Sequence, residues 1–113
     1  MTIAIHEEGT YTDTPGDTWD VIQTTSPNTT EGVFQFSVAA NALVAGETLE
    51  ARLQVKDAAA GTLRTVWAFS VTGVQSIPQI TSPGIALMND WDFSMRQRTG
   101  TGRAIKWSIV KVT

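Results

Sequence analysis

The sequence predicts an all-β protein that folds as one antiparallel β-sandwich with six to seven strands. Three observations support this prediction. Several segments alternate apolar and polar side chains with the period of two that a half-buried strand requires. Threonine, valine and isoleucine, which favour strands, are frequent along the chain. Connectors with glycine or proline separate the alternating segments, and no segment has the length and period of a long helix. The strand order stays open, and a jelly roll is one arrangement that fits.

The clearest strand covers residues 47–57. Leu49, Leu53 and the two apolar residues at positions 51 and 55 point one way, and the polar residues between them point the other way. Such alternation predicts a sheet with one buried face and one wet face. A second strand over residues 33–39 places Phe34 and Phe36 on one face.

Residues 62–71 form a strand of a different kind. Trp67 and Phe69 share one face, but Val66 and Ala68 make the opposite face apolar as well. A strand that is apolar on both faces is usually covered on both faces. We therefore expect the second cover to be the N-terminal arm or another subunit.

Two alternating segments dominate the last quarter of the chain. The first runs over residues 91–98 and gathers Trp91, Phe93 and Met95 on one face. The second runs over residues 103–112 and gathers Ile105, Trp107 and Ile109 on one face. The connector between them, residues 99–102, contains two glycines, which allow the positive φ angles of hairpin turns. We predict an antiparallel hairpin whose aromatic face needs a second layer to cover it.

The N-terminal region lacks a sustained pattern. We predict an extended arm over residues 1–18, within which residues 1–6 could form a short edge strand, and a sandwich domain over residues 19–113. Residues 85–88 form an apolar patch after a Pro-Gly pair, and the pattern leaves open whether this patch is core or interface.

Composition excludes several classes of partner. The net charge is −3 and the isoelectric point is about 4.9, so we expect no general nucleic-acid binding and no binding to anionic membranes. There is no cysteine, hence no disulfide or thiolate chemistry. No apolar run is long enough to span a bilayer, and residues 1–8 do not resemble a signal peptide.

The sequence contains no arrangement typical of an active site. The single histidine, His6, has no metal-ligand partners at a recognisable spacing. Asp13, Asp17 and Asp20 are too irregularly spaced for a calcium loop and are expected to be loop residues. We therefore expect no enzyme, no catalytic or metal-binding residues and no cofactor.

Four tryptophans raise a sugar-binding alternative, because exposed indole rings can stack on sugars. Trp67, Trp91 and Trp107 share strand faces with phenylalanine or isoleucine, which favours a place in the core. Trp19 follows the polar arm and could sit at a subunit contact.

The last third of the chain also carries a family-like pattern. Gln97 precedes the Thr-Gly-Thr-Gly run of residues 99–102, Arg103 follows at once, and Trp107-Ser108-Ile109 comes near the end. Residues 31–36, 41–43 and 46–53 extend the likeness. Residues 31–112 thereby resemble small structural proteins of tailed double-stranded DNA bacteriophages, often capsid cement or decoration proteins. That family defines no catalytic residues, so none is implied here.

The resemblance implies a capsid decoration protein that binds the outside of the assembled capsid and stabilises it. Its partners would be the major capsid protein of the same virion and further copies of itself, with a trimer as the expected oligomer. The protein would be made in the bacterial host cytoplasm and lie on the capsid exterior. A tail, spike or head–tail component is the alternative, and a carbohydrate-binding β-sandwich module is the second alternative.

Seven aromatic or apolar residues are our candidates for contacts with these partners. They are Tyr11, Trp19, Val66, Ala68, Ile85, Leu87 and Met88.

Overall fold

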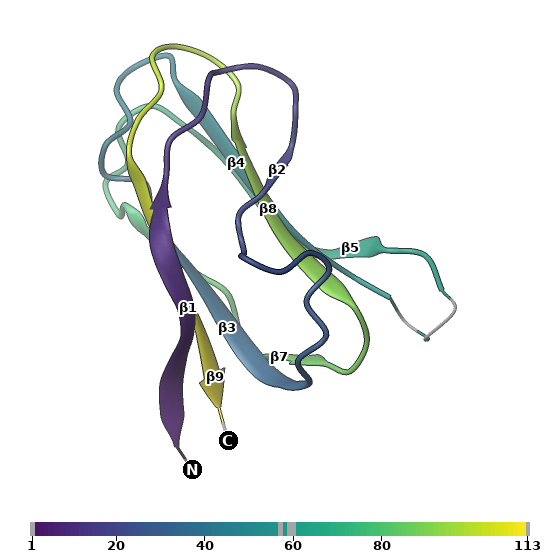
Figure 1. The fold of residues 1–113 in the computed structure, drawn as a ribbon. Coiled ribbons are helices and arrows are strands. Elements are labelled where there is room, and N and C mark those ends of the chain that lie inside the picture. Colours follow the sequence, from purple (N-terminus) through teal and green to yellow (C-terminus); the bar gives the residue numbers. More distant parts are fainter. Residues whose placement is uncertain (1, 57, 59–60, 113) are drawn as a thin grey trace.

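The computed structural model describes residues 2–56, 58 and 61–112, and these residues form nine strands and no helix (Figure 1). The predicted all-β sandwich is confirmed. There are more strands than the six to seven expected, because three are only two or three residues long: β2 (Asp20–Val21), β6 (Gln79–Thr81) and β7 (Ile85–Leu87). Such short pieces leave no alternation to detect in a sequence. Asp57, the last residue of one predicted strand, lies outside the described residues.

The strands form two antiparallel sheets that face each other (Figure 1). Sheet A has the order β1-β9-β3-β6, and β7 also pairs with β3. Sheet B has the order β2-β8-β4-β5. The longer strands are β1 (Ile3–Tyr11), β3 (Gly32–Ala39), β4 (Thr48–Val55), β5 (Arg64–Thr72), β8 (Trp91–Gln97) and β9 (Ile105–Val112).

The core lies between the inner faces of the two sheets and is centred on aromatic rings. Phe36 of sheet A is fully buried, and its ring centroid lies 4.9 Å from that of Phe93 and 5.7 Å from that of Trp91, both in sheet B. Trp67 of β5, also in sheet B, stacks on Phe36 with 6.4 Å between the ring centroids. Aromatic pairs at these separations add to the stabilisation that burial alone provides. The predicted inward faces of residues 91–95 and 105–109 are confirmed.

The predicted hairpin over residues 91–112 is wrong. β8 pairs with β4 and β2 in sheet B, whereas β9 pairs with β1 and β3 in sheet A. The connector, residues 98–104, therefore crosses from one sheet to the other (Figure 1). Two consecutive strands with inward aromatic faces can lie side by side or face to face, and alternation is the same in both arrangements. Here the two strands lie in opposite sheets, and the inward rings of β8 are covered by Phe36 of β3.

The side chain of Gln97 holds the connector between the sheets through hydrogen bonds to its backbone. This side chain is almost fully buried and donates hydrogen bonds to the carbonyl oxygens of Thr99 and Thr101, at 2.9 and 2.7 Å. Its side-chain oxygen accepts a hydrogen bond from the backbone N–H of Arg103 at 3.0 Å. A buried amide that satisfies three backbone groups fixes the path of the loop around it.

Glu47 holds the same connector from the loop before β4. Its carboxylate accepts hydrogen bonds from the backbone N–H groups of Val44 and Thr101 and from the guanidinium Nε of Arg103, at 2.9 to 3.0 Å. Gly100 adopts φ +85°, and a Cβ there would lie 2.5 Å from Cγ of Glu47. A glycine is therefore required at this position both by the backbone conformation and by the close approach.

The N-terminal segment belongs largely to sheet A. β1 pairs with β9 from Ile3 opposite Val112 to Tyr11 opposite Ile105, with a bulge at His6. Residues 3–11 of the predicted arm are therefore a strand of the sandwich. Residues 12–18 then cross to sheet B, where the Gly16 N–H donates to the carbonyl oxygen of Gln97 at 3.0 Å. The predicted division at residue 18 does not separate an arm from a body in this structure.

Trp107 provides a test of the core. It lies in β9, is 7% exposed, and stands opposite Gly9 of β1, whose missing side chain leaves room for the indole ring. Trp107→Ala should lower the free energy of unfolding by about 3–5 kcal/mol, because it removes a large buried side chain. Urea denaturation measures this change. Ser108→Ala, on the outer face of the same strand, is the control and should cost less than about 0.5 kcal/mol. A loss under about 1 kcal/mol for Trp107→Ala would contradict the assigned faces.

Glu47 predicts a pH dependence of stability. The hydrogen bond from Arg103 is the largest of the effects that lower the pKa of Glu47 from 4.5 to about 2. Because the folded pKa is below the unfolded one, the stabilisation is present above pH 4.5 and is lost as the pH falls toward 2. The melting temperature of Glu47→Gln should lie below that of the wild type at neutral pH, and the difference should shrink over this range.

Calorimetry across the pH range measures the difference. Glu31→Gln, which removes an exposed carboxylate just before β3, is the control and should follow the wild type at every pH. If the difference in melting temperature between Glu47→Gln and the wild type stayed constant down to low pH, the charge of Glu47 would not be what holds the connector.

Candidate functional site

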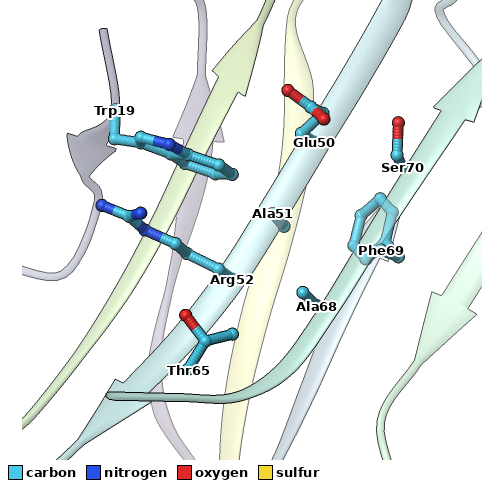
Figure 2. A pocket seen from close by; sticks show the side chains of 8 residues that line it. All are labelled: Trp19, Glu50, Ala51, Arg52, Thr65, Ala68, Phe69 and Ser70. Carbon is cyan, nitrogen blue, oxygen red and sulfur yellow. The ribbon is translucent and has the colours of Figure 1, made fainter. Parts of the chain in front are cut away.

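A hollow with a volume of about 440 Å³ lies on the outer face of sheet B (Figure 2). We call it the Arg52 hollow. Its floor is made by β4 and β5, and its rim by the segment before β2. It is lined by Trp19, Glu50, Ala51, Arg52, Thr65, Ala68, Phe69 and Ser70.

The alternation of β4 and β5 explains why a hollow forms here. The inward positions of β4 hold Leu49 and Leu53, so Glu50 and Arg52 point outward between them. Ala68 stands opposite Arg52 on β5, and Ser70 stands opposite Glu50. Long side chains on one strand beside small ones on the next leave a depression over β5.

Trp19 lies over the arginines of this face. The guanidinium carbons of Arg52 and Arg96 are each 4.3 Å from the centroid of the Trp19 ring. Figure 2 shows the indole ring over the end of the Arg52 side chain. Cation–π contacts of this kind contribute about 0.5–2 kcal/mol. Trp19 is half-buried, so its ring is both a support for the arginines and a part of the surface.

The arginines near Trp19 differ in their charge partners. Arg96 pairs with Glu50, with 2.8 Å between Nε and Oε1, and Arg98 pairs with Asp17 at 2.9 Å and more distantly with Glu50 at 3.7 Å. Arg52 has no carboxylate partner and no hydrogen bond within the described part of the chain, and its Nε is buried without an acceptor. Burial and the nearby charge of Arg96 lower the pKa of the Arg52 guanidinium.

A second candidate surface lies on the outer face of sheet A. Ile3 stands opposite Val112, which stands opposite Val33, which stands opposite Ala86, so four adjacent strands present one line of apolar side chains. Side chains directly opposite each other point to the same face of a sheet. Ile5 and Val110 form the next pair along the strands. We call these six residues the apolar row. Ile3 is 61% exposed, Ile5 58% and Val33 39%.

Three of the predicted interface residues lie at the Arg52 hollow. Trp19 and Ala68 line it, and Val66 is 51% exposed on the neighbouring part of β5. Val66 has no direct partner on β4, because the register shifts between Leu53 and Gln54. This β-bulge leaves Val66 unpaired across the strands, and its side chain is exposed among the described residues.

Tyr11 serves a contact within the chain. Its hydroxyl group donates to Oδ2 of Asp20 at 2.6 Å and lies 3.3 Å from the carbonyl oxygen of Met95, which ties β1 to sheet B. Burial, together with the hydrogen bonds to Asp20 and Asp13, raises the pKa of the Tyr11 phenol.

The apolar patch of residues 85–88 divides between core and surface. Leu87 is fully buried, which corrects its assignment as an interface residue, and Ile85 is half-buried against the core. Met88 is 69% exposed and remains available to a partner. Alternation along β7 explains the split, since Ile85 and Leu87 point inward and Ala86 points outward.

The polar residues considered for chemistry have structural partners. His6 Nε2 lies 3.2 Å from Asn28 Nδ2, and its ring packs against Phe34. Asp13 accepts from the Gln97 N–H, whereas Asp17 pairs with Arg98. Within residues 2–56, 58 and 61–112 no group of three or more histidine or acidic side chains could hold a metal ion. In the same residues no helix is long and apolar enough to cross a membrane.

The tryptophans do not form an exposed strip. Trp91 is fully buried, Trp107 is 7% exposed, and Trp67 packs against Phe36 on the inner side of sheet B. Of the four, only Trp19 lies on an outer sheet face.

Comparison with known proteins gives no relative. No protein-family model matches the chain, and neither a curated protein nor a solved structure matches it.

Sequence reasoning missed Arg52 and the apolar row. In the sequence Arg52 is one of several polar residues on the wet face of a strand, and nothing local shows that it lacks a carboxylate partner. The row is assembled from four segments far apart along the chain. The one local signal was Val33, an apolar residue next to the inward Phe34.

Proposed function

We propose that the protein is a structural component of the virion of a tailed double-stranded DNA bacteriophage, and specifically a capsid decoration protein. It binds the outside of the assembled capsid and stabilises it. The resemblance over residues 31–112 suggests this class. The apolar row is the observation that best supports a role in assembly, because a soluble monomer rarely presents so ordered an apolar line.

The two outer faces suit different partners. Contacts between permanently associated copies are rich in apolar area, whereas contacts with a separately folded partner are more polar and use arginine and tryptophan as anchors. We assign the apolar row to contacts between copies of this chain. We assign the Arg52 hollow, with Trp19 and the exposed Val66, to the major capsid protein.

Our expected assembly is a trimer, since a symmetric trimer matches the local threefold positions of a capsid lattice. A protein that binds only assembled capsid shifts the equilibrium toward the assembled state by mass action. The net charge of −3 suits a shell protein that does not bind the packaged DNA. A tail, spike or head–tail position is the alternative. The arrangement of the tryptophans gives no support to the sugar-binding alternative, which needs two exposed rings on one strip.

Light scattering behind a sizing column tests the role of the apolar row. The wild type should have three times the 12.2 kDa mass of the chain. Ile3→Ser combined with Ile5→Ser should give a monomer with a nearly unchanged melting temperature, because both side chains are exposed on the sheet surface. The control, Val21→Ser with Val66→Ser, likewise replaces two exposed β-branched apolar side chains by serine, but on sheet B, and should remain a trimer. A trimer in the Ile3/Ile5 variant would contradict the assignment of the row.

Copy number in purified virions tests the proposed function. Quantitative mass spectrometry should find this chain in a fixed ratio to the major capsid protein, as expected of a protein that covers the lattice. A few rings of copies per particle would instead place it in the tail, spike or head–tail junction. Absence from purified particles would contradict a virion role altogether.

A further inference from the structure

The Arg52 hollow contains one cation, Arg52, that no carboxylate among the described residues neutralises. Glu50 and Asp17 are engaged by Arg96 and Arg98, and within residues 2–56, 58 and 61–112 Arg52 has no carboxylate partner. Removing a cation partly from water without a counter-charge is unfavourable, so such an arginine is primed to accept an anionic partner.

The geometry leaves Arg52 able to bind. The guanidinium carbon of Arg52 lies 4.3 Å from the centroid of the Trp19 ring, and this cation–π contact holds the side chain in place. The contact is made to the charge of the group and fills none of the oxygen-acceptor positions that its N–H groups can use. The Nε atom is buried, whereas the two terminal nitrogens are not among the buried atoms without a partner and face the hollow. A carboxylate can accept two parallel hydrogen bonds from those nitrogens.

The shape of the hollow favours a protein surface over a free small molecule. It is wide open, whereas small-molecule sites enclose most of their ligand. Around it, β5 presents small exposed side chains, including Thr65, Val66, Ala68 and Ser70. Arginine and tryptophan, which lie at its centre, are two of the residue types enriched in protein-binding hot spots.

We propose that the Arg52 hollow receives an aspartate or glutamate side chain of the protein on which this chain docks. That this partner is the capsid protein rests on the proposed function. The recognition of a carboxylate by Arg52 and Trp19 does not depend on that function. The carboxylate lies against the terminal nitrogens of Arg52, with the hydroxyl groups of Thr65 and Ser70 within the same lining.

The test is a titration of the full-length protein with a blocked peptide of alternating glutamate and glycine, followed by NMR of the arginine Nε–H and tryptophan indole N–H signals. The signals of Arg52 and Trp19 should shift together and saturably. The Nε–H of Arg64, an exposed arginine at the start of β5, serves as the reference within the same spectrum. Arg52→Met should weaken peptide binding about tenfold or more, and Arg64→Met, which removes the same charge, should change it less than about twofold.

Several results would overturn the inference. Equal weakening by Arg52→Met and Arg64→Met would show only unspecific attraction to positive charge. Shifts of Arg52 on adding free glucuronate but not the peptide would indicate an acidic sugar as the ligand. Capsid binding that is intact in Arg52→Met would exclude this hollow from docking while leaving the decoration function in place. Saturable peptide binding by a protein that is absent from virions would overturn the function and leave the carboxylate site standing.

Discussion

The packing of aromatic rings around Phe36 is the constraint on which the rest of the structure depends. Phe36 from sheet A contacts Trp67, Trp91 and Phe93 from sheet B, so the two sheets share one core and neither has a buried face without the other. This contact buries the inner faces of both sheets. A binding partner would therefore contact the outer faces, and the alternation of each strand determines which side chains lie there.

Polar residues at the crossings between the sheets make this arrangement specific. Glu47 and Gln97 fix the connector from β8 to β9 at one end of the sandwich. In the segment that leads from β2 to β3, Gln23 donates to the carbonyl oxygen of Trp91 and accepts from the Phe93 N–H, and Asn28 exchanges two backbone hydrogen bonds with Trp91. Because these buried polar groups find their partners in this arrangement, they hold the outer faces in a fixed geometry, which the proposed docking on a capsid would require.

The sequence allowed the faces of the strands to be predicted but not their neighbours. Alternation correctly assigned Phe34, Phe36, Trp91 and Ile109 to the core, because burial acts on each strand separately. It could not distinguish a hairpin from two facing strands, so the partner of β9 was wrongly assigned. Leu87 was misjudged because a strand of three residues shows no period. Among the described residues, Arg52 lacks a carboxylate partner because Glu50, beside it on the same face, pairs with Arg96 of the adjacent strand. This pairing depends on how the strands are placed in the sheet, which the sequence pattern does not show.

In the proposed role, one molecule uses its apolar face for its own copies and its polar, arginine-bearing face for the capsid. The most direct test is a cryo-electron microscopy difference map between virions that contain the protein and virions from which its gene has been deleted. We expect trimeric density on the capsid exterior at local threefold positions, with the outer face of sheet B toward the shell. Difference density confined to the tail or the head–tail junction, or no difference density at all, would contradict the proposed place of this protein on the capsid.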